Sequence, residues 1–446
     1  MEHPSTQWNE EGGVSRSDPF RMLFVTETWP PETNGVARTA LRLVDGLAAR
    51  GHDVHVVRPR QGPDDYVHTD HSETLVAGIP VPFCRDLRVG LPVYDRLRQL
   101  MERLQPDVVH VATEGPLGWA AVSAAKRAGI PVSADLHFNY HLYSRYYATE
   151  ALSSIVLAYL RKFHNRADGT FVPTKKLARD LLTQGVDHLA VVGRGVDATL
   201  FSPARRSIAL RREWGAHGTA PVVLYAGRLA AEKNLDLALR TFAAIRARVP
   251  LARLVLIGDG PLRASVEQRE PDAVVLGWRH SRALAECYAS ADILLFPSLT
   301  ETFGNVTLDS LASGLAIVAF DYAAAGELME DGVSGCLVPY ADEEAFVAAA
   351  RALALAPARI ARLGAAARRV AEQHPWERAI GAFESYLRYA LIEPSQEALP
   401  ALNVGAAVDP IALISEWRGH VSCATGKCDV PSLPSSGVLS KSSVNV

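Results

Sequence analysis

The sequence predicts an α/β fold built from two parallel-sheet halves, and three observations lead to this class. Short apolar runs alternate with segments of helical periodicity from residue 21 to about residue 373, which is typical of strand–helix–strand units. Near 196–219 this alternation is interrupted by Pro203, an arginine-rich run and two glycines, and it then begins again. The 446 residues are enough for two hydrophobic cores.

The first half opens with a strand at 21–26 and a helix whose apolar residues recur from Val36 to Ala48. Gly51 ends that helix, and 52–59 forms the next strand, so this unit predicts a parallel sheet with a right-handed crossover. Further strands are expected at 107–112, 130–137 and 169–174, and further helices at 115–129, 148–166 and 175–185.

The second half repeats this architecture without repeating the sequence. Its strands are expected at 220–227, 252–260, 273–278, 291–298 and 316–320, with helices between them. The alanine- and arginine-rich stretch 341–373 is expected to be helical, and 374–392 forms a last amphipathic helix.

These patterns give the expected domain boundaries. The first domain spans 20–196, the second spans 197–373, and the helix at 374–392 packs back on the first domain. Residues 1–19 are polar, and 393–446 are rich in serine, proline and glycine, so both ends are expected to be disordered.

Composition narrows the function classes. The net charge of −3 gives no reason to expect a nucleic-acid partner. The five cysteines are scattered without a zinc-binding pattern, and the N-terminus lacks the features of a secretion signal, so we expect a reducing cytoplasm. No apolar run approaches the roughly 20 residues that cross a bilayer, so the chain is expected to be soluble or peripheral on a membrane.

Two acids in the second half indicate a ligand site. Glu301 follows an apolar strand directly, and Asp309 lies eight positions later in the next expected helix, about two turns along it. Between them Phe303, Gly304 and Asn305 turn the chain and present backbone N–H groups. Carboxylates suit sugar and ribose hydroxyls, and free amides at a helix start suit phosphates, so this loop predicts a nucleotide-sugar site.

Two cations follow the first strand of the second half. Arg228 and Lys233 could meet a diphosphate, the arginine as a fork and the lysine as a point charge. The ordinary alternative is a solvated loop in which Glu232 pairs with Lys233.

Gly35 and His137 also follow expected strands, in the first half. Gly35 would let the backbone approach a ligand closely, although the surrounding prolines also suit an ordinary turn. A single histidine such as His137 is more often structural than functional. Arg194 belongs either to a cleft between the domains or to a structural ion pair, and Gly258–Gly260 is interpreted as a strand-to-helix turn.

Five segments together carry a family resemblance: 34–36 (NGV), 134–140, 191–197, 225–234 and 297–314. On these motifs, residues 21–390 resemble the retaining GT-B glycosyltransferases of family four. Within that family the chain looks most like bacterial glycolipid mannosyltransferases and sulfoquinovosyl-type lipid glycosyltransferases. The resemblance implies two Rossmann-like domains that face a central cleft. Asn34 stands where the family often has the first of two adjacent glycines.

The resemblance also implies roles for the site residues. His137 would face the transferred sugar, Glu301 its hydroxyls, and Asp309 the ribose, although the family usually has the longer glutamate at this last position. The residues with an implied catalytic role are His137, Glu301, Arg228 and Lys233. The implied donor-binding residues are Gly35, Arg228, Lys233, Phe303, Gly304, Asn305 and Asp309.

The mechanism implied is front-face retaining transfer, in which the leaving phosphate takes the proton of the acceptor. No Asp-x-Asp motif is present, so neither a catalytic metal nor a cofactor beyond the nucleotide sugar is expected. GDP-mannose is the first expectation for the donor and a UDP-sugar is the second.

The acceptor is expected to be a lipid or a glycan. Segments 83–104 and 139–166 are both basic and apolar, which would suit contact with an anionic membrane, although packing helices with solvated arginines would look similar. Two other functions remain open: a sucrose- or trehalose-type synthase with a soluble acceptor, and a nucleotide-sugar-binding partner with little activity.

Overall fold

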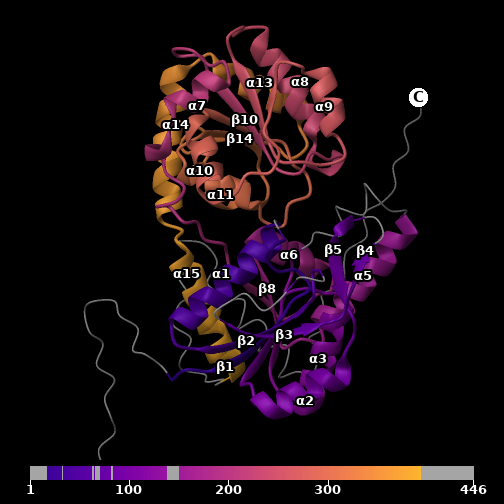
Figure 1. Cartoon of the computed structure of the whole chain (residues 1–446). Coiled ribbons are helices and arrows are strands. Elements are labelled where there is room, and N and C mark those ends of the chain that lie inside the picture. Colours follow the sequence, from indigo (N-terminus) through magenta and orange to yellow (C-terminus); the bar gives the residue numbers. More distant parts are fainter. Residues whose placement is uncertain are drawn as a thin grey trace, which may run out of the picture. The chain divides into compact units, whose positions relative to one another are not determined.

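The computed structural model describes residues 18–32, 34–62, 65, 71–81, 84–137 and 150–392. The described residues all belong to one compact unit, Met1–Pro400, which contains two large parallel sheets (Figure 1). The predicted α/β class with two parallel-sheet halves is confirmed. The ends expected to be disordered, 1–19 and 393–446, lie outside the described residues apart from Asp18 and Pro19.

The first sheet has seven strands in the order β3-β2-β1-β6-β7-β8-β9, and all its pairings are parallel. Its strands are β1 (Arg21–Val25), β2 (Asp53–Pro59), β3 (Ser72–Val76), β6 (Val108–Val111), β7 (Val132–Asp135), β8 (Gly169–Val172) and β9 (Leu189–Val191). The strand order reverses beside β1, which is where open α/β sheets bind their ligands. The short strands β4 (Gly78–Val81) and β5 (Cys84–Gly90) form a separate antiparallel pair.

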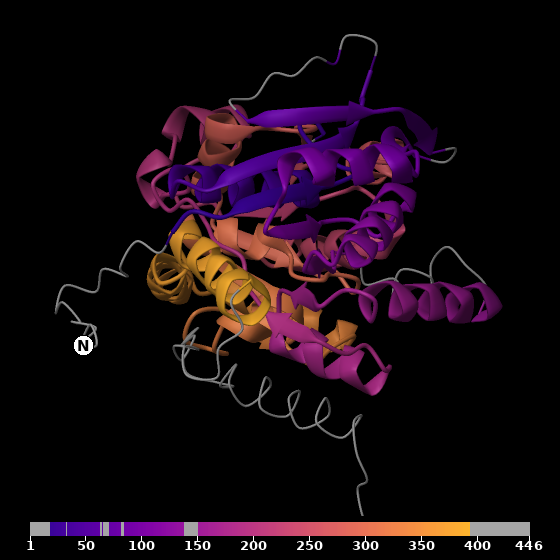
Figure 2. The ribbon, with the colours of Figure 1, turned by 90° about the horizontal axis from the view of Figure 1, so that it is seen from below.

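Helices cover both faces of the first sheet (Figure 2). They are α1 (Gly35–Ala49), α2 (Tyr94–Leu104), α3 (Pro116–Ala128), α5 (Glu150–His164) and α6 (Lys175–Thr183). Leu23 and Val25 of β1 share one apolar cluster with α2 and α3. The alternate residue, Phe24, points to the other face, where its ring lies 5.0 Å from that of His110.

The second sheet has six strands in the order β12-β11-β10-β13-β14-β15, again all parallel. Its strands are β10 (Val222–Ala226), β11 (Arg253–Ile257), β12 (Val274–Val275), β13 (Ile293–Phe296), β14 (Ala316–Phe320) and β15 (Cys336–Val338). Its helices are α7 (Ile208–Glu213), α8 (Leu235–Arg246), α9 (Arg263–Arg269), α10 (Ser281–Ser290), α11 (Asn305–Ala312), α12 (Ala323–Leu328), α13 (Glu343–Ala354) and α14 (Pro357–Glu372).

The strands of the second sheet are apolar throughout because both of its faces are covered. In β10, Val222 and Leu224 belong to one hydrophobic cluster, whereas Val223 and Tyr225 belong to the cluster on the opposite face. Strands β13 and β14 divide their residues between the same two clusters. This is the expected pattern of a parallel sheet between two helical layers, and it explains why the apolar runs were visible in the sequence.

The end of the described chain returns to the first half. Helix α15 (Trp376–Tyr386), drawn in yellow-orange, packs against α1 so closely that a Cβ added at Gly46 would lie 2.2 Å from Ile380 (Figures 1 and 2). The ring of Phe383 lies 4.6 Å from that of Phe171 in β8. A π-helical segment, Leu387–Ile392, follows directly.

Several elements differ from the sequence prediction. Strands β3, β4, β5, β9 and β15 were not expected, because they are short and interrupted by polar residues or turns. In the basic, apolar segment 83–104, the described residues form β5 followed by α2, and in segment 139–166 residues 139–149 lie outside the described residues. The helical stretch 341–373 is divided by Pro357, which begins α14.

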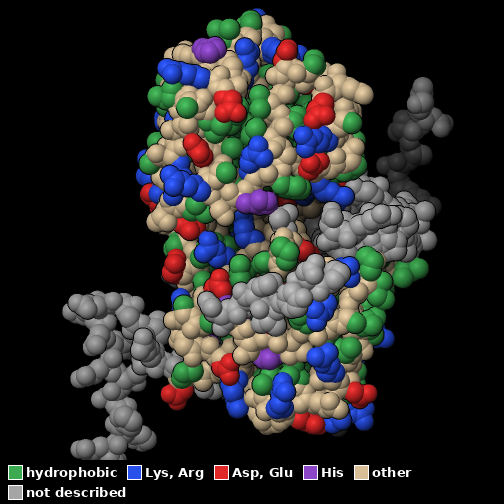
Figure 3. All heavy atoms as spheres, viewed as in Figure 1, with side chains coloured by type: hydrophobic (Ala, Val, Ile, Leu, Met, Phe, Trp, Pro, Cys, Tyr) green, Lys and Arg blue, Asp and Glu red, His purple; other side chains and the backbone are tan. Residues whose placement is uncertain are grey.

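Charged side chains of both signs are interspersed on the face shown in Figure 3. Among the residues that the structure describes, no helix has both the length and the apolar character needed to cross a bilayer.

Candidate functional site

Most of the predicted site residues lie in the loops that follow parallel strands, whereas Asp309 lies within α11 (Asn305–Ala312). Arg228 and Lys233 follow β10, and Glu301 follows β13, which is hydrogen-bonded to β10. In the first half, Gly35 follows the loop after β1 and His137 follows β7. The topology therefore gathers these residues at the ligand-binding edges of their sheets.

Glu301 and Lys233 are in direct contact. Lys233 Nζ lies 2.5 Å from Glu301 Oε1, and Ser298 Oγ donates a hydrogen bond of 2.7 Å to the same oxygen. Tyr322 donates its hydroxyl hydrogen to the Glu301 carbonyl. The alternative in which Lys233 pairs with Glu232 is therefore wrong, because the lysine reaches across to the neighbouring loop.

Arg228 lies at the start of the same loop and is partly exposed. Its Nη1 lies 3.4 Å from Oε1 of Glu232, which is buried. Thr300 Oγ1 donates to the carbonyl of Glu232 at 3.2 Å, so it ties the Arg228–Lys233 loop to the Glu301 loop. The two cations are thus held on a loop that is fastened to the acid.

The turn at 303–305 has the geometry that the sequence predicts. Gly304 has φ 92° and stands at the N-cap of α11, so no side chain caps the first N–H groups of this helix. A Cβ at Gly304 would lie 3.2 Å from Phe296. Asn305 is the first residue of α11, and Phe303 is buried beneath the turn. Uncapped amides at a helix start favour negatively charged ligands.

Asp309, expected at the ribose, has a partner that the sequence analysis missed. Arg38 Nη1 lies 2.9 Å from its Oδ2, and only 4% of Asp309 is exposed. Burial raises the pKa of Asp309 above its ordinary value, and the charge of Arg38 partly offsets this effect. Arg38 lies one turn after Gly35 in α1, but no pattern in the sequence connects it with Asp309, which is 271 residues away.

The Gly35 loop meets the Asn305 turn. A Cβ added at Gly35 would lie 3.3 Å from Asn305 Nδ2. Asn34, at the place of the family's first glycine, caps α1 by accepting a hydrogen bond from the Ala37 N–H at 2.8 Å. Asn34 therefore caps the helix with its side chain, which a glycine could not do.

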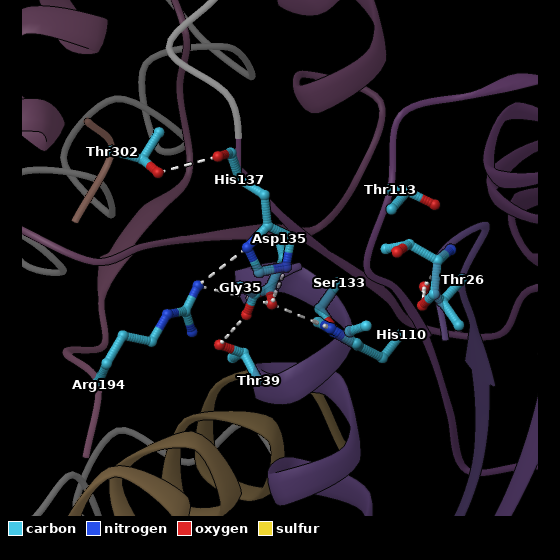
Figure 4. Close-up of polar contacts among 12 residues, drawn as sticks. Thr26, Gly35, Thr39, His110, Thr113, Ser133, Asp135, His137, Arg194 and Thr302 are labelled. Carbon is cyan, nitrogen blue, oxygen red and sulfur yellow. Dashed lines mark hydrogen bonds and ion pairs between the residues drawn. The ribbon is translucent and has the colours of Figure 1, made fainter. Parts of the chain in front are cut away.

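His137 lies within a polar cluster of the first half (Figure 4). Arg194 Nη2 lies 3.2 Å from its Nδ1, and Asp135 Oδ2 lies 3.0 Å from its Nε2. Burial alone would raise the pKa of Asp135, but His137 and His110 outweigh it and hold that pKa well below its usual range. Thr302, next to Glu301, donates to the His137 carbonyl at 2.9 Å.

The Gly258–Gly260 turn is explained by backbone packing. Gly258 has φ 132°, and a Cβ there would lie 1.9 Å from the Gly227 carbonyl oxygen. Asp259 pairs with Arg263 at 2.8 Å. These glycines are required by the close approach of two loops.

The predicted residues thus form three groups. Lys233 contacts Glu301, and Asp309 is joined by Arg38 to the helix that begins at Gly35. His137 contacts Asp135. Arg228 contacts Glu232. Within the described parts of the chain, no three or more histidine, cysteine, aspartate or glutamate side chains are arranged to hold a metal ion.

Two family models match this chain, one in each half. Residues 33–200 match the family model described as Glycosyltransferase Family 4, and residues 220–355 match the one described as Glycosyl transferases group 1. A GDP-mannose-dependent alpha-mannosyltransferase of Mycobacterium tuberculosis is 33% identical over 332 residues, which cover 73% of this chain and 85% of that protein. A sulfoquinovosyl transferase of Arabidopsis thaliana is 27% identical over 378 residues, covering 82% and 72%.

Solved structures share the fold. The sucrose-phosphate synthase of Thermosynechococcus elongatus aligns with a TM-score of 0.69 at 18% identity, covering 83% of this chain and 98% of that one. Anabaena HepE, solved in complex with UDP, aligns with a TM-score of 0.65 at 18% identity, covering 83% and 100%. This likeness confirms the predicted GT-B architecture.

Proposed function

This chain belongs to glycosyltransferase family 4, and on that basis we propose that it transfers a mannosyl residue from GDP-mannose to a hydroxyl of a lipid acceptor, with retention of configuration. The chain is a glycosyltransferase. Relatives at 30–33% identity are named for GDP-mannose, which supports this donor over a UDP-sugar. The observation that carries the proposal is the contact of Lys233 with Glu301 on adjacent strand-end loops.

Arg228 and Lys233 are the proposed diphosphate ligands. Negative charge develops on the leaving diphosphate, and cations held beside it stabilise the transition state. The ammonium of Lys233 has three N–H donors, so it can keep its contact with Glu301 and still donate to a phosphate oxygen. The backbone N–H groups of Phe303, Gly304 and Asn305 would contact the same diphosphate.

The proposed sugar and ribose contacts come from the acids and the histidine. Glu301 would accept hydrogen bonds from hydroxyls of the transferred sugar, and His137 would contact the same sugar from the first half. Asp309 would accept from the ribose while it stays paired with Arg38, because a carboxylate has more acceptor positions than one guanidinium nitrogen uses. Gly35 would allow the backbone of its loop to approach the donor.

The proposed mechanism is front-face substitution without a bound metal. The acceptor oxygen forms a bond to the anomeric carbon as the bond from that carbon to the diphosphate oxygen breaks. The acceptor proton passes to the leaving diphosphate, so no separate base is needed. Arg228 and Lys233 supply the positive charge near the leaving group. Activity that persists in excess chelator would support this proposal, and loss restored by one divalent cation would overturn it.

We propose that the acceptor is reached at an anionic membrane surface, with the protein on its cytoplasmic side. In α5 the residues Ile155 and Tyr159 are 65% and 41% exposed, and Arg161 and Lys162 follow in its last turn. Hydrophobic side chains gather at the edge of the face over this helix (Figure 3). An apolar stripe with adjacent cations suits an interface with anionic lipid.

The test of the donor is calorimetric binding of GDP, UDP, GDP-mannose and UDP-glucose to the full chain without added metal. We expect binding of GDP and GDP-mannose. Lys233→Ala should weaken both, whereas Glu301→Ala should weaken GDP-mannose more than GDP, which carries no sugar for Glu301 to contact. Preference for the uridine ligands would replace the proposed donor, and binding of a donor without transfer to any acceptor would support a weakly active binding protein. No binding of any of the four would overturn the proposed site.

The test of the membrane contact is flotation with vesicles that contain anionic lipid, compared with neutral vesicles at the same low salt. We expect binding to the anionic vesicles only, and weaker binding for Ile155→Ser. Leu355→Ser, with an exposed leucine in the second half, is the matched control. Equal behaviour of both variants would contradict a role for α5.

A further inference from the structure

Two acid–histidine contacts in the first half leave buried polar atoms without an aligned hydrogen bond, and one of the two includes His137. Asp135 is 1% exposed, yet among the described residues neither of its carboxylate oxygens has a hydrogen bond of good geometry, and the same holds for Nε2 of His137 and Nε2 of His110. Leaving a buried charge without aligned partners is costly, so such groups in a native protein call for an explanation. Asp135 was not singled out in the sequence analysis.

The sheet geometry brings these groups together. Ser133, Asp135 and His137 alternate along β7 and its extension, so they share one side of the strand. His110 of β6 pairs in register with Ser133, and its Nδ1 lies 2.9 Å from the serine Oγ. The remaining nitrogen, Nε2, lies 3.8 Å from Asp135 Oδ2 (Figure 4). The carboxylate is thus flanked by two imidazoles.

The contacts of His137 fix the position of its ring proton. Arg194 can only donate hydrogen bonds, so the ring nitrogen it approaches at 3.2 Å, Nδ1, must be an acceptor without a proton. The one ring proton then lies on Nε2, which is 3.0 Å from Asp135 Oδ2. This separation is that of a hydrogen bond, and a small ring rotation would align it.

A purely structural ion pair would be arranged differently. Arg194 is buried, and its distance to the Asp135 carboxylate is 4.0 Å, longer than its 3.2 Å approach to the histidine. The guanidinium therefore contacts the histidine nitrogen in preference to the nearest negative charge. A guanidinium that donates to Nδ1 of His137 is the arrangement expected if this nitrogen carries no proton.

We propose that Asp135 is a positioning residue that holds the ring proton of His137 on Nε2, so that Nδ1 accepts a hydrogen bond from one hydroxyl of the transferred hexose. That hydroxyl takes the position from which Arg194 donates. The inference rests on the proposed function, because it requires a donor sugar beside His137. It adds a specificity rule: the enzyme selects a sugar with a hydroxyl, rather than an ether or a hydrogen, at that position.

The first test reads the proton directly and needs no activity. Long-range ¹H–¹⁵N spectra of the histidine-labelled full chain distinguish a protonated from an unprotonated ring nitrogen, and His137→Gln identifies the signal. We expect wild-type His137 to carry its proton on Nε2 between pH 7 and 8, and Asp135→Asn to give a mixture of both tautomers. A proton on Nδ1 in the wild type, or an unchanged tautomer in the variant, would overturn the proposal.

The second test compares GDP-mannose with its four monodeoxy analogues. We expect the wild type to lose about tenfold or more in kcat/KM with one analogue, the approximate value of one hydrogen bond that leaves a buried partner unpaired. In His137→Ala that penalty should disappear, and in Asp135→Asn it should fall to about threefold or less. Arg194→Gln should keep the penalty, because the proton stays on Nε2 of His137 when the guanidinium that competes with the sugar hydroxyl is removed.

A matched control separates positioning from stability. Glu114 and His164 form another buried acid–histidine contact in the first half, at 3.4 Å, so Glu114→Gln removes a similar charge. We expect Glu114→Gln to lower stability and keep the deoxy-sugar penalty. If Asp135→Asn lowers activity equally for all analogues and keeps the full penalty, the role of Asp135 is structural only.

If GDP-mannose is not turned over at all, the proposed donor is wrong, while the tautomer test still decides this inference.

Discussion

At the scale of single residues, the acids of the candidate site are each paired with a cation from another loop or helix. Lys233 meets Glu301, and Arg38 meets Asp309. The cation offsets part of the cost of placing a carboxylate in a partly or fully buried position, where an isolated charge would be unfavourable. A nucleotide sugar brings both phosphate charge and hydroxyl groups, so it can share these partners without leaving either charge unpaired.

Lys233→Ala is expected to lower the affinity for GDP by about 10- to 100-fold, because a charge-assisted hydrogen bond contributes about 1.5–3 kcal/mol. Calorimetry measures the effect. Lys126→Ala is the matched control, since Lys126 pairs with Asp168 at 2.7 Å on the outside of the first half. Equal affinities for GDP in the wild type and in Lys233→Ala would remove Lys233 from the proposed site.

Glu27 is a second residue whose environment has a measurable consequence. It follows β1 and is buried, and its Oε1 accepts a hydrogen bond from the Leu117 N–H at 2.8 Å. Burial raises the pKa of Glu27 from 4.5 to about 7, and the nearby charge of Glu114 adds to this effect, whereas the Leu117 hydrogen bond opposes it. The folded chain therefore holds a proton on Glu27 that the unfolded chain has already released.

Stability should fall as the pH rises through this interval. Below pH 4.5 both states are protonated and Glu27 has no effect; between 4.5 and about 7 the folded state binds more protons, so the free energy of unfolding decreases with pH. Above that interval the full loss, about 3 kcal/mol, is present. Glu27→Gln keeps an acceptor for Leu117 and should remove this loss.

Urea unfolding from pH 5 to 8 tests this prediction. The stability of Glu27→Gln relative to the wild type should rise across the interval and level off near pH 8. Glu102→Gln, which changes an exposed acid of α2, should give a nearly constant difference. A constant difference for Glu27→Gln as well would mean that its carboxyl titrates normally.

At the scale of elements, the site depends on how strand ends turn into helices. The turn before α11 requires a positive φ at Gly304, and this conformation leaves the first amides of the helix uncapped. The turn after β1 instead uses Asn34 as a side-chain cap. The first N–H groups of α11 thus have no side-chain cap, whereas α1 is capped by Asn34.

Gly304→Ala is expected to lose more stability than Gly51→Ala, although the two glycines have nearly the same φ, 92° and 95°. The positive φ costs both variants about 1–2 kcal/mol. At Gly51 a Cβ meets nothing within 4 Å, whereas at Gly304 it would lie 3.2 Å from Phe296 and 3.5 Å from Glu301 Cγ. Urea unfolding and GDP titration of both variants measure the difference, and weaker GDP binding is expected for Gly304→Ala alone. Identical losses and identical affinities would contradict this account of the turn.

At the scale of the whole molecule, the described chain passes back to the first half after its second sheet is complete. Helix α14 packs on the second half, and α15 then supplies Phe383 and Tyr386 to the core of the first half. A Cβ at Gly169 of β8 would lie 2.7 Å from the Tyr386 hydroxyl, so strand and helix fit closely. The first half is therefore incomplete without a segment about 200 residues away in sequence.

Truncation after residue 373 should destabilise the first half selectively, since the loss of a buried phenylalanine alone costs about 3–5 kcal/mol. Hydrogen exchange should rise in β1, β6 and β8 more than in β10 and β13. Truncation after residue 392 is the control, and its melting temperature should match that of the full chain. Equal exchange in both truncated chains would show that α15 is dispensable for the first half.

The sequence by itself determined the class of fold, the two halves and the places where ligand residues emerge. It could do so because strands buried on both faces appear as continuous apolar runs, and because Gly35, Arg228 and Glu301 come directly after such runs or their loops. Family membership was visible for the same reason: the motifs are local in sequence.

Only the tertiary structure decided which charges meet. Lys233 and Glu301 are 68 residues apart, and Arg38 and Asp309 are 271 apart, so no local pattern specifies these pairs. The same holds for Asp135, whose alternation with His137 is local but whose second imidazole, His110, comes from the neighbouring strand. Side-chain periodicity fixes the face on which a residue lies, whereas the partner on that face depends on strand order and register, which arise only when the sheet forms.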